Sequence, residues 1–346
     1  MTNKGYDGAT PQVDGDVLSA VELNDSLSVA KFTKHFQQRS SCEALISHSN
    51  TAHSFLTSGN AIHLISGANG ADTTTSKNTD LDTDSMIRVC EGTKTSGFAI
   101  EINATTAETA LTSDSGTTWT TTTSAAFGGS PNDVSFPTTG LIVVGGDDTA
   151  GTDHVVFSTD SAATWTDATT SPGIVACLHM FDGTTGYVID TSDNIWKTVN
   201  SAVDWTDTTD NFTTSVSNTS SMRCISSDIF FCSYISSGDF SIEQYTNSTN
   251  TITKVFKTIG TFDGTLGFIE TTDGTLWTGA YNNDAQGLYV IAKSEDDGAT
   301  WETCEFTSSV ATVAAARTKK SSISEAGTDS VLIIIGEGKV MRISKN

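Results

Sequence analysis

Basic residues are scarce in this sequence. Its 346 residues include 18 Lys and Arg against 41 Asp and Glu, which gives a net charge of −23. Proteins that bind nucleic acid neutralise phosphates with clustered Lys and Arg, so the composition argues against nucleic acid as a partner. A strongly acidic surface instead favours solubility in a salty or extracellular setting.

Long apolar stretches are also missing. No run approaches the roughly 18 apolar residues of a membrane-spanning helix, and residues 1–8 contain no apolar core of a secretory signal peptide. We therefore expect neither membrane insertion nor signal-directed export. An extracellular composition without an export signal fits a virion or phage-tail component, assembled inside the cell and working outside it. A mature chain whose signal has been removed fits as well, although Met1 argues against it.

The cysteines do not follow a metal-binding pattern. No pair has the CxxC spacing and none is paired with a histidine, which argues against zinc. Their neighbours are apolar and strand-like, so we expect buried free thiols, with the redox state left open. The six residues are Cys42, Cys90, Cys177, Cys224, Cys232 and Cys304.

Recognisable catalytic and metal motifs are absent from the sequence. The six histidines are scattered, without a Ser-His-Asp order, an HExxH motif or a P-loop. Asp80, Asp82 and Asp84 alternate as in a calcium loop, with Glu91 at the twelfth position counted from Asp80. However, Ser85 stands where an EF-hand requires glycine. We predict solvated acidic loops and no cofactor, with calcium at these aspartates as the alternative.

What the sequence does contain is a repeated eight-residue segment, Ser/Thr-x-Asp-x-Gly-x-Thr-Trp, which we call the box. It occurs at 112–119 and 294–301, and at 158–165 with Ala162 in place of glycine. In a tight turn the Asp carboxylate accepts backbone N–H groups and glycine supplies a positive φ. The Trp then leaves the turn and packs against the adjoining layer.

Degenerate copies of the box extend the series. One lies at 198–205, with Asn200 for Asp and Ala202 for Gly, and a more degenerate one at 245–252. The final positions of successive copies, from Trp119 onward, are 46, 40, 47 and 49 residues apart. This period matches one four-stranded propeller blade.

A second repeat supports the same period. Residues 181–196 and 262–277 share seven of sixteen positions at an offset of 81, which we interpret as two blades. Residues 136–144 are a shorter relative one blade upstream. Each copy has turn residues followed by an apolar strand.

These repeats predict an all-β propeller of about seven four-stranded blades, with six as the alternative. We expect two regions, an N-terminal arm at 1–41, for attachment or closure, and the propeller at 42–346. The predicted blades are 42–80, 81–125, 126–170, 171–210, 211–258, 259–306 and 307–346. The hairpin at 331–343 lacks an outer strand, so pairing between N- and C-terminal segments, with residues 42–48 as a candidate, is expected to close the ring and remove exposed edges.

The box resembles the Asp-box (BNR) repeat of β-propellers such as sialidases, sortilin-type receptors and photosystem assembly propellers. The resemblance implies turns on the rim that join outer strands, away from the central site, and it implies no particular activity. The residues given a structural role by it are Asp114, Gly116, Trp119, Asp160, Trp165, Trp205, Asp296, Gly298 and Trp301.

The sialidase catalytic set is not recognisable. That activity is associated with three arginines that hold a carboxylate, a Tyr–Glu pair, an acidic acid/base and a Phe/Tyr-Arg-Ile-Pro motif, and no such motif occurs here. Arg88, Arg223 and Arg317 nevertheless have similar places in the opening strands of their blades. Because opening strands line the channel, these arginines are candidates for a central anion site. The alternative is that they pair with acidic side chains.

For function we expect a non-enzymatic structural protein on the surface, tail or fibre of a virion, whose propeller binds a host-surface glycan or protein. Residues 15–24 resemble the openings of phage tail and fibre proteins, so the N-terminal arm is the expected contact with other particle proteins. Homo-oligomers are compatible with this expectation. A sialidase-like glycoside hydrolase and a cell-envelope assembly or scaffold propeller are the alternatives.

Overall fold

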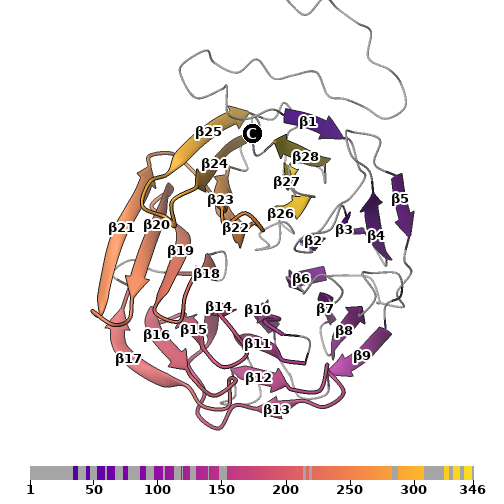
Figure 1. Cartoon of the computed structure of the whole chain (residues 1–346), viewed down its shortest axis with the longest axis vertical. Coiled ribbons are helices and arrows are strands. Elements are labelled where there is room, and N and C mark those ends of the chain that lie inside the picture. The colour runs from indigo at the N-terminus through magenta and orange to yellow at the C-terminus, as the bar shows by residue number, and fades with distance from the viewer. Residues whose placement is uncertain are drawn as a thin grey trace, which may run out of the picture.

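Strands are the regular elements of this computed structural model (Figure 1). The residues that it describes are 34–37, 44–46, 53–58, 61–66, 73–76, 86–90, 97–103, 106–112, 118, 120–124, 130–138, 140–147, 154–212, 216–217, 220–282, 287–307, 323–326, 330–335 and 339–344. Among them there is no helix, and so none with the length and apolar character needed to cross a membrane.

The strands form seven four-stranded antiparallel sheets, which we number as blades in chain order. From the inner to the outer strand, they are blade 1 with β2 (Ala44–Ile46), β3 (His53–Ser58), β4 (Ala61–Ser66) and β5 (Thr73–Ser76); blade 2 with β6 (Met86–Cys90), β7 (Gly97–Asn103), β8 (Thr106–Thr112) and β9 (Thr120–Ser124); blade 3 with β10 (Ser130–Ser135), β11 (Ile142–Asp147), β12 (Val155–Ser158) and β13 (Thr166–Asp167); blade 4 with β14 (Val175–Met180), β15 (Gly186–Asp190), β16 (Asn194–Thr198) and β17 (Thr206–Asn211); blade 5 with β18 (Ser221–Cys224), β19 (Ile229–Ser236), β20 (Asp239–Thr246) and β21 (Thr251–Thr258); blade 6 with β22 (Gly264–Glu270), β23 (Leu276–Tyr281), β24 (Leu288–Ser294) and β25 (Glu302–Thr307); and blade 7 with β26 (Ile323–Ala326), β27 (Ser330–Ile335), β28 (Lys339–Ser344) and β1 (Lys34–Gln37).

The blades follow one another around a central axis, with the first strand of each sheet innermost (Figure 1). The fold is therefore a β-propeller, and the sequence prediction of an all-β propeller is confirmed. The sheets of blades 1 to 4 and of blade 6 begin within about five residues of the predicted blade starts, whereas those of blades 5 and 7 begin at Ser221 and Ile323, well after the predicted starts at 211 and 307.

The ring is closed by a strand from the N-terminal arm. β1 pairs antiparallel with β28, from Lys34 opposite Ile343 to Gln37 opposite Val340. Closure by N- and C-terminal segments is thus confirmed, but residues 42–48 are the wrong segment. Ala44–Ile46 instead forms the inner strand of blade 1 and pairs with β3. The hairpin of β27 and β28 lacks an outer strand, so the strand that closes the ring must add at the outer edge of blade 7.

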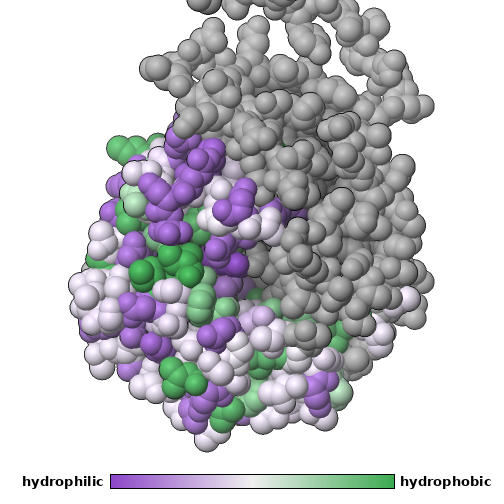
Figure 2. All heavy atoms as spheres, viewed as in Figure 1, coloured by the Kyte–Doolittle hydropathy of each residue, from purple (hydrophilic) through white to green (hydrophobic). Residues whose placement is uncertain are grey.

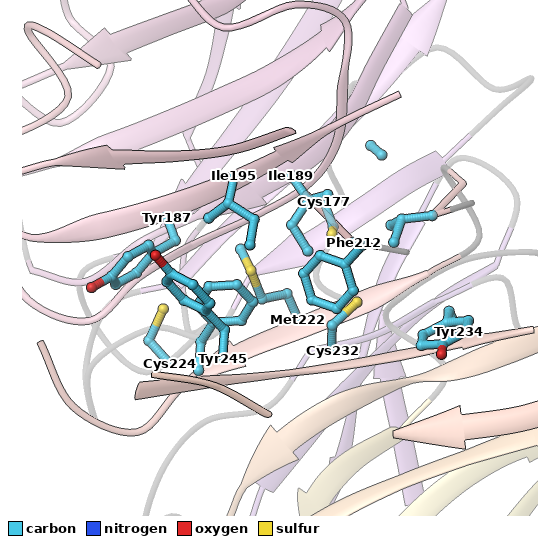
Figure 3. Packing of buried hydrophobic residues seen from close by; sticks show 13 residues of the cluster. Cys177, Tyr187, Ile189, Ile195, Phe212, Met222, Cys224, Cys232, Tyr234 and Tyr245 are labelled. Atoms are coloured by element: carbon cyan, nitrogen blue, oxygen red, sulfur yellow. The ribbon is translucent and has the colours of Figure 1, made fainter. Parts of the chain in front are cut away.

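The core lies between the faces of adjacent blades. Cys177 of β14, Phe230 of β19 and Tyr245 of β20 belong to one buried cluster that joins blades 4 and 5 (Figure 3). The rings of Phe230 and Tyr245 are 5.1 Å apart between centroids. The first two strands of blade 4, β14 and β15, are almost entirely buried, whereas the outer strand β17 is polar and largely exposed. The hydrophobic contribution to stability thus comes from blade-to-blade packing.

The second sequence repeat has a different structural meaning from the one predicted. Residues 181–185 form the turn between the first and second strands of blade 4, whereas residues 262–263 precede the first strand of blade 6. Accordingly, Trp196 lies on the third strand of its blade and Trp277 on the second. The offset of 81 residues therefore does not join equivalent positions two blades apart. The copies share a turn-then-buried-strand pattern, which recurs at more than one place within a blade.

Candidate functional site: the box turns and the groove between blades 4 and 5

The described boxes connect the third and fourth strands of their blades. In blade 3, Asp160 accepts hydrogen bonds from the backbone N–H of Thr164 at 2.8 Å and from its hydroxyl at 2.6 Å. Blade 6 repeats both distances between Asp296 and Thr300. These bonds lower the pKa of each carboxyl below its ordinary 3.8. The largest cause is the hydrogen bond that the hydroxyl of Thr164 donates to Asp160, and that of Thr300 to Asp296.

In blades 3 and 4 the box is also attached to the turn between the first two strands of the same blade. The N–H of Ser161 donates to the carbonyl oxygen of Gly140 at 3.1 Å, and the N–H of Ser201 donates to that of Thr184 at 3.1 Å. The Trp of a box packs inward, as Trp301 does against Phe231 with ring centroids 6.1 Å apart. The boxes of blades 3 and 6 therefore have a structural role, in which Asp and Thr hold the turn between the third and fourth strands.

The degenerate box of blade 4 has the same shape with its hydrogen bonds rearranged. The Oδ1 atom of Asn200 accepts the N–H of Asp204 at 3.0 Å. The Nδ2 atom of Asn200 then donates to Oδ2 of Asp204 at 2.9 Å, so the side-chain bond runs in the opposite direction from the one in intact boxes. The carboxylate has moved from the third to the seventh position of the box, where intact copies carry threonine.

The degenerate copy of blade 5 is a tight turn between β20 and β21. Asn250 has a φ of 54°, and its Oδ1 accepts the hydroxyl of Tyr245 at 3.2 Å. The turn is held by Asp228, whose carboxylate accepts the N–H and the hydroxyl of Ser248, each at 2.7 Å. Since Asp228 lies after β18, this contact again attaches an outer turn to an inner one.

A groove of about 430 Å³ opens between these two degenerate boxes. Its floor and walls come from the end of β16, the two turns and the start of β17. The lining residues are Lys197, Val199, Asn200, Asp204, Thr206, Thr208, Asn247 and Asn250. The volume falls within the range of roughly 300–1,000 Å³ that is usual for small-molecule sites.

The described surface of the molecule is mixed in character. In the view of Figure 2, apolar residues form separate small patches between polar ones on the described part of that face. Among described residues the exposed large apolar side chains are Phe181, Val199 and Ile259, and Val199, which is 68% exposed, lines the groove. An exposed valine beside amides and hydroxyls gives the groove one apolar contact.

The predicted central arginines are only partly within the described chain. Arg88 lies on β6, an inner strand, and Arg317 lies outside the described residues. Arg223 lies on β18, also an inner strand, and its guanidinium is 3.4 Å from a carboxylate oxygen of Glu270 on β22. The contact matches the alternative in which these arginines pair with acidic side chains.

His179 on β14 lies near Arg223 at the inner strands, close enough for the charge of Arg223 to affect its pKa. Burial and the positive charge of Arg223 hold the pKa of His179 well below its ordinary 6.5. The neutral imidazole accepts the N–H of Cys224 at its Nδ1 atom, 3.3 Å away, and so joins β14 to β18. Other inner-strand groups make similar connections, for example Asp133 to the N–H of Leu178 at 2.9 Å. In the described part of the channel wall, polar side chains thus connect neighbouring blades.

A Tyr–Glu pair that sequence inspection missed lies inside blade 5. The hydroxyl of Tyr234 donates to Glu243 at 2.7 Å, and Lys254 lies 3.4 Å from the same carboxylate oxygen. Both members of the pair are buried on the second and third strands. Alternation on neighbouring strands is the signal that could have found the pair. Its position makes it part of the sheet and not of the channel.

The remaining predicted site residues divide between described and undescribed parts of the chain. Asp80, Asp82, Asp84, Asp114, Gly116 and Trp119 lie outside the described residues. Within the described residues, no group of three or more His, Cys, Asp or Glu side chains is arranged to hold a metal ion. Of the cysteines, the structure describes four as buried free thiols, namely Cys177, Cys224, Cys232 and Cys304.

Comparison with known proteins finds similarity in structure alone. Neither a family model nor a curated protein sequence matches the chain. Among solved structures, YCF48 bound to D1 peptide is similar with a TM-score of 0.61 at 14% identity, over 94% of this chain and 98% of that one. The GH74 xyloglucanase from Xanthomonas campestris is similar with a TM-score of 0.61 at 12% identity, over 88% of this chain and 53% of that one. U3-55K is similar with a TM-score of 0.64 at 8% identity, over 91% and 99% of the two chains. At these identities the likeness establishes the β-propeller fold of this chain.

Proposed function

We propose that this chain is a non-enzymatic recognition propeller on the outside of a particle, a structural component of a virion surface, tail or fibre that binds a host-surface glycan or protein. The observation that carries the proposal is the open groove between blades 4 and 5, where hydrogen-bonding side chains face solvent. Binding sites combine a concave shape with a few convergent polar groups, and this groove has both.

The composition supports an extracellular setting for this role. A net charge of −23 keeps such a surface soluble and discourages association with nucleic acid. In the proposal, the propeller faces the host while the part of the arm that precedes β1 contacts other particle proteins. YCF48, a propeller of similar fold, has been solved bound to D1 peptide.

The alternative of a sialidase-like hydrolase finds less support in the geometry. It requires arginines that hold a substrate carboxylate, whereas Arg223 contacts Glu270. It also requires an accessible Tyr–Glu pair, whereas Tyr234 is 0% and Glu243 only 3% exposed. A cell-envelope scaffold propeller would use the same kind of groove, and its cellular location would distinguish it.

The proposal is tested by location and by binding. Mass spectrometry of purified particles is expected to detect the chain in fixed copy number. Fluorescently labelled full-length chain is expected to bind the host surface saturably. Absence from particles would overturn the virion assignment in favour of the envelope scaffold. Release of sugar from a sialoside or xyloglucan substrate by the purified chain would overturn the non-enzymatic assignment.

A further inference from the structure

The two degenerate boxes line the same groove. Val199, Asn200 and Asp204 come from the copy at 198–205, and Asn247 and Asn250 come from the copy at 245–252. The described intact boxes, at 158–165 and 294–301, contribute nothing to it. Departures from a local structural rule are expected where function replaces it. From this coincidence we infer that the groove is a binding site for a neutral saccharide, an inference that rests on the proposed recognition function and names its ligand class.

The groove offers both hydrogen-bond donors and hydrogen-bond acceptors. The ammonium group of Lys197 and the Nδ2 of Asn250, whose Oδ1 is taken by Tyr245, are donors. Asp204, whose Oδ2 accepts from Asn200, also lines the groove, and both oxygens of a carboxylate can accept hydrogen bonds. Asn247 offers both kinds of group. Each sugar hydroxyl both donates and accepts, so a saccharide matches this lining.

The charges in the groove favour a neutral ligand. Lys197 and Asp204 line it together and carry opposite signs. A saccharide with a carboxylate would gain from the lysine and be repelled by the aspartate, so its net electrostatic gain is small. Val199, 68% exposed, provides an apolar contact for the C–H face of a pyranose ring.

A peptide strand fits the groove less well. It would add to the edge strand β17, which carries Thr206 and Thr208 along the groove. That edge is irregular, because the pairing with β16 shifts register and Thr209 has a φ of 67°. Irregular edges of this kind block the addition of a further strand. Besides Val199, the lining has no apolar side chain to anchor a peptide.

Restoring an intact box provides the sharpest test, because it changes the groove and preserves the fold. The double substitution Asn200→Asp with Asp204→Thr recreates the arrangement of blade 3 and removes the groove carboxylate. The matched control, Asp160→Asn with Thr164→Asp, installs the reversed arrangement in blade 3, outside the groove. Both full-length variants and the parent are applied to an array of neutral and sialylated oligosaccharides, a peptide display library and the host surface.

The expected result is binding of the parent and the blade 3 variant to neutral oligosaccharides, with affinity about tenfold or more lower for the blade 4 variant. Asn247→Ala, which leaves both boxes unchanged, is expected to weaken the same binding. Equal saccharide affinity of parent and blade 4 variant would overturn the groove assignment. Selection of peptides, or of sialylated glycans alone, would overturn the neutral saccharide class. After either of these outcomes, binding of the parent to the host surface would still support the proposed function. If the parent does not bind the host surface at all, the proposed function itself is wrong.

Discussion

A residue from the neighbouring blade determines whether the fifth position of a box tolerates alanine or requires glycine. Gly298 has a φ of 85°, and Ala162 and Ala202 hold the same left-handed conformation in their boxes, at 63° and 68°. That conformation costs a residue with a Cβ about 1–2 kcal/mol. A Cβ on Gly298 would in addition meet the ring of Phe231 from blade 5. Glycine is therefore required in blade 6, while alanine is tolerated in blades 3 and 4.

Gly298→Ala is expected to lower the free energy of unfolding by about 2–4 kcal/mol, from the left-handed conformation together with overpacking against Phe231. Gly274→Ala is the matched control, because its φ is 84° and no atom lies within 4 Å of the added methyl group. The control should lose only about 1–2 kcal/mol. Urea unfolding of both variants measures the difference, and equal losses would contradict the role given to Phe231.

The hydrogen bonds from threonine to the carboxylates of the intact boxes determine how the stability of these turns changes with pH. Hydrogen bonds, first of all from the Thr300 hydroxyl, lower the pKa of Asp296 below 3.8 in the folded protein. A lowered folded-state pKa contributes stability above the unfolded-state pKa, and this contribution is lost as pH falls through the folded-state value. Acid should therefore weaken the box turns at the low end of the pH range.

Thr300→Val removes that hydroxyl and preserves the side-chain shape. We expect the pKa of Asp296, followed by NMR of its carboxyl carbon, to rise toward 3.8 in the variant. The parent should be more stable than the variant at pH 7, and the two should converge as the pH falls below the folded-state pKa of Asp296. A stability difference that persists unchanged at pH 2 would show that threonine acts through packing and not through the carboxylate.

At the scale of the element, the degenerate box of blade 4 preserves the turn by exchanging roles between two side chains. In intact copies a carboxylate accepts from a threonine hydroxyl, as Asp160 does at 2.6 Å. In blade 4 an amide donates to a carboxylate, Asn200 to Asp204, at 2.9 Å. The backbone follows the same path because the N–H of the seventh position still has an acceptor in the third, at 3.0 Å in blade 4.

This exchange predicts non-additive stability effects in blade 4. Asn200→Asp alone brings a second carboxylate against Asp204 and removes the amide donor, so it should destabilise by about 0.5–1.5 kcal/mol. Adding Asp204→Thr should recover most of that loss, because the intact arrangement is restored. Thermal unfolding of the two single variants and the double variant gives the coupling energy. A coupling energy of zero would mean that the two side chains do not form the bond described.

At the scale of the whole molecule, the ring depends on a strand far from its partner in sequence. β1 covers the edge of β28, and without it blade 7 would have three strands and an open edge. Such an edge exposes unpaired N–H and C=O groups and invites association with other chains. β1 takes over this outer-edge position, and its pairing with β28 ties the last blade to a segment that precedes blade 1 in the sequence, so hydrogen bonds hold the ring closed.

Replacing both His35 and Phe36 with proline should open the ring. In an antiparallel strand, one of two adjacent N–H groups faces the partner, so the pair of substitutions removes a bond to β28 whichever residue donates it. We expect a Tm lower by at least several degrees and a new tendency to oligomerise. Calorimetry and light scattering measure the two effects. An unchanged Tm with a monomeric variant would mean that β1 is dispensable for closure.

Prediction from sequence succeeded where the signal is local. The box turns follow from side chains within eight residues, so their spacing also located the blades. The repeat at 181–196 and 262–277 misled in its phase, because a turn followed by a buried strand occurs several times in each blade. Residues 42–48 were the wrong closing segment because β-strand patterns do not encode which partner a strand takes.

The candidate site was not predictable in the same way. The central arginines were proposed from their position in the opening strands, but the pairing of Arg223 with Glu270 depends on where β22 places its last residue. The Tyr234–Glu243 pair joins neighbouring strands and needs their register to be known. Each degenerate box is visible in the sequence as a departure from the repeat. The groove could not be predicted, because it forms only where the two boxes lie next to each other in the folded protein.

The sequence by itself determined the all-β class, the propeller, its blade period and the position of each box, because hydrogen-bonded turns depend on residues close together in the chain. Only the tertiary structure decided that residues 34–37 close the ring, since a strand finds its partner through non-local pairing. It also decided that two degenerate boxes in adjacent blades line one groove. The tertiary structure also decided that Asn200 donates to Asp204, because this donor and acceptor meet only in the folded turn.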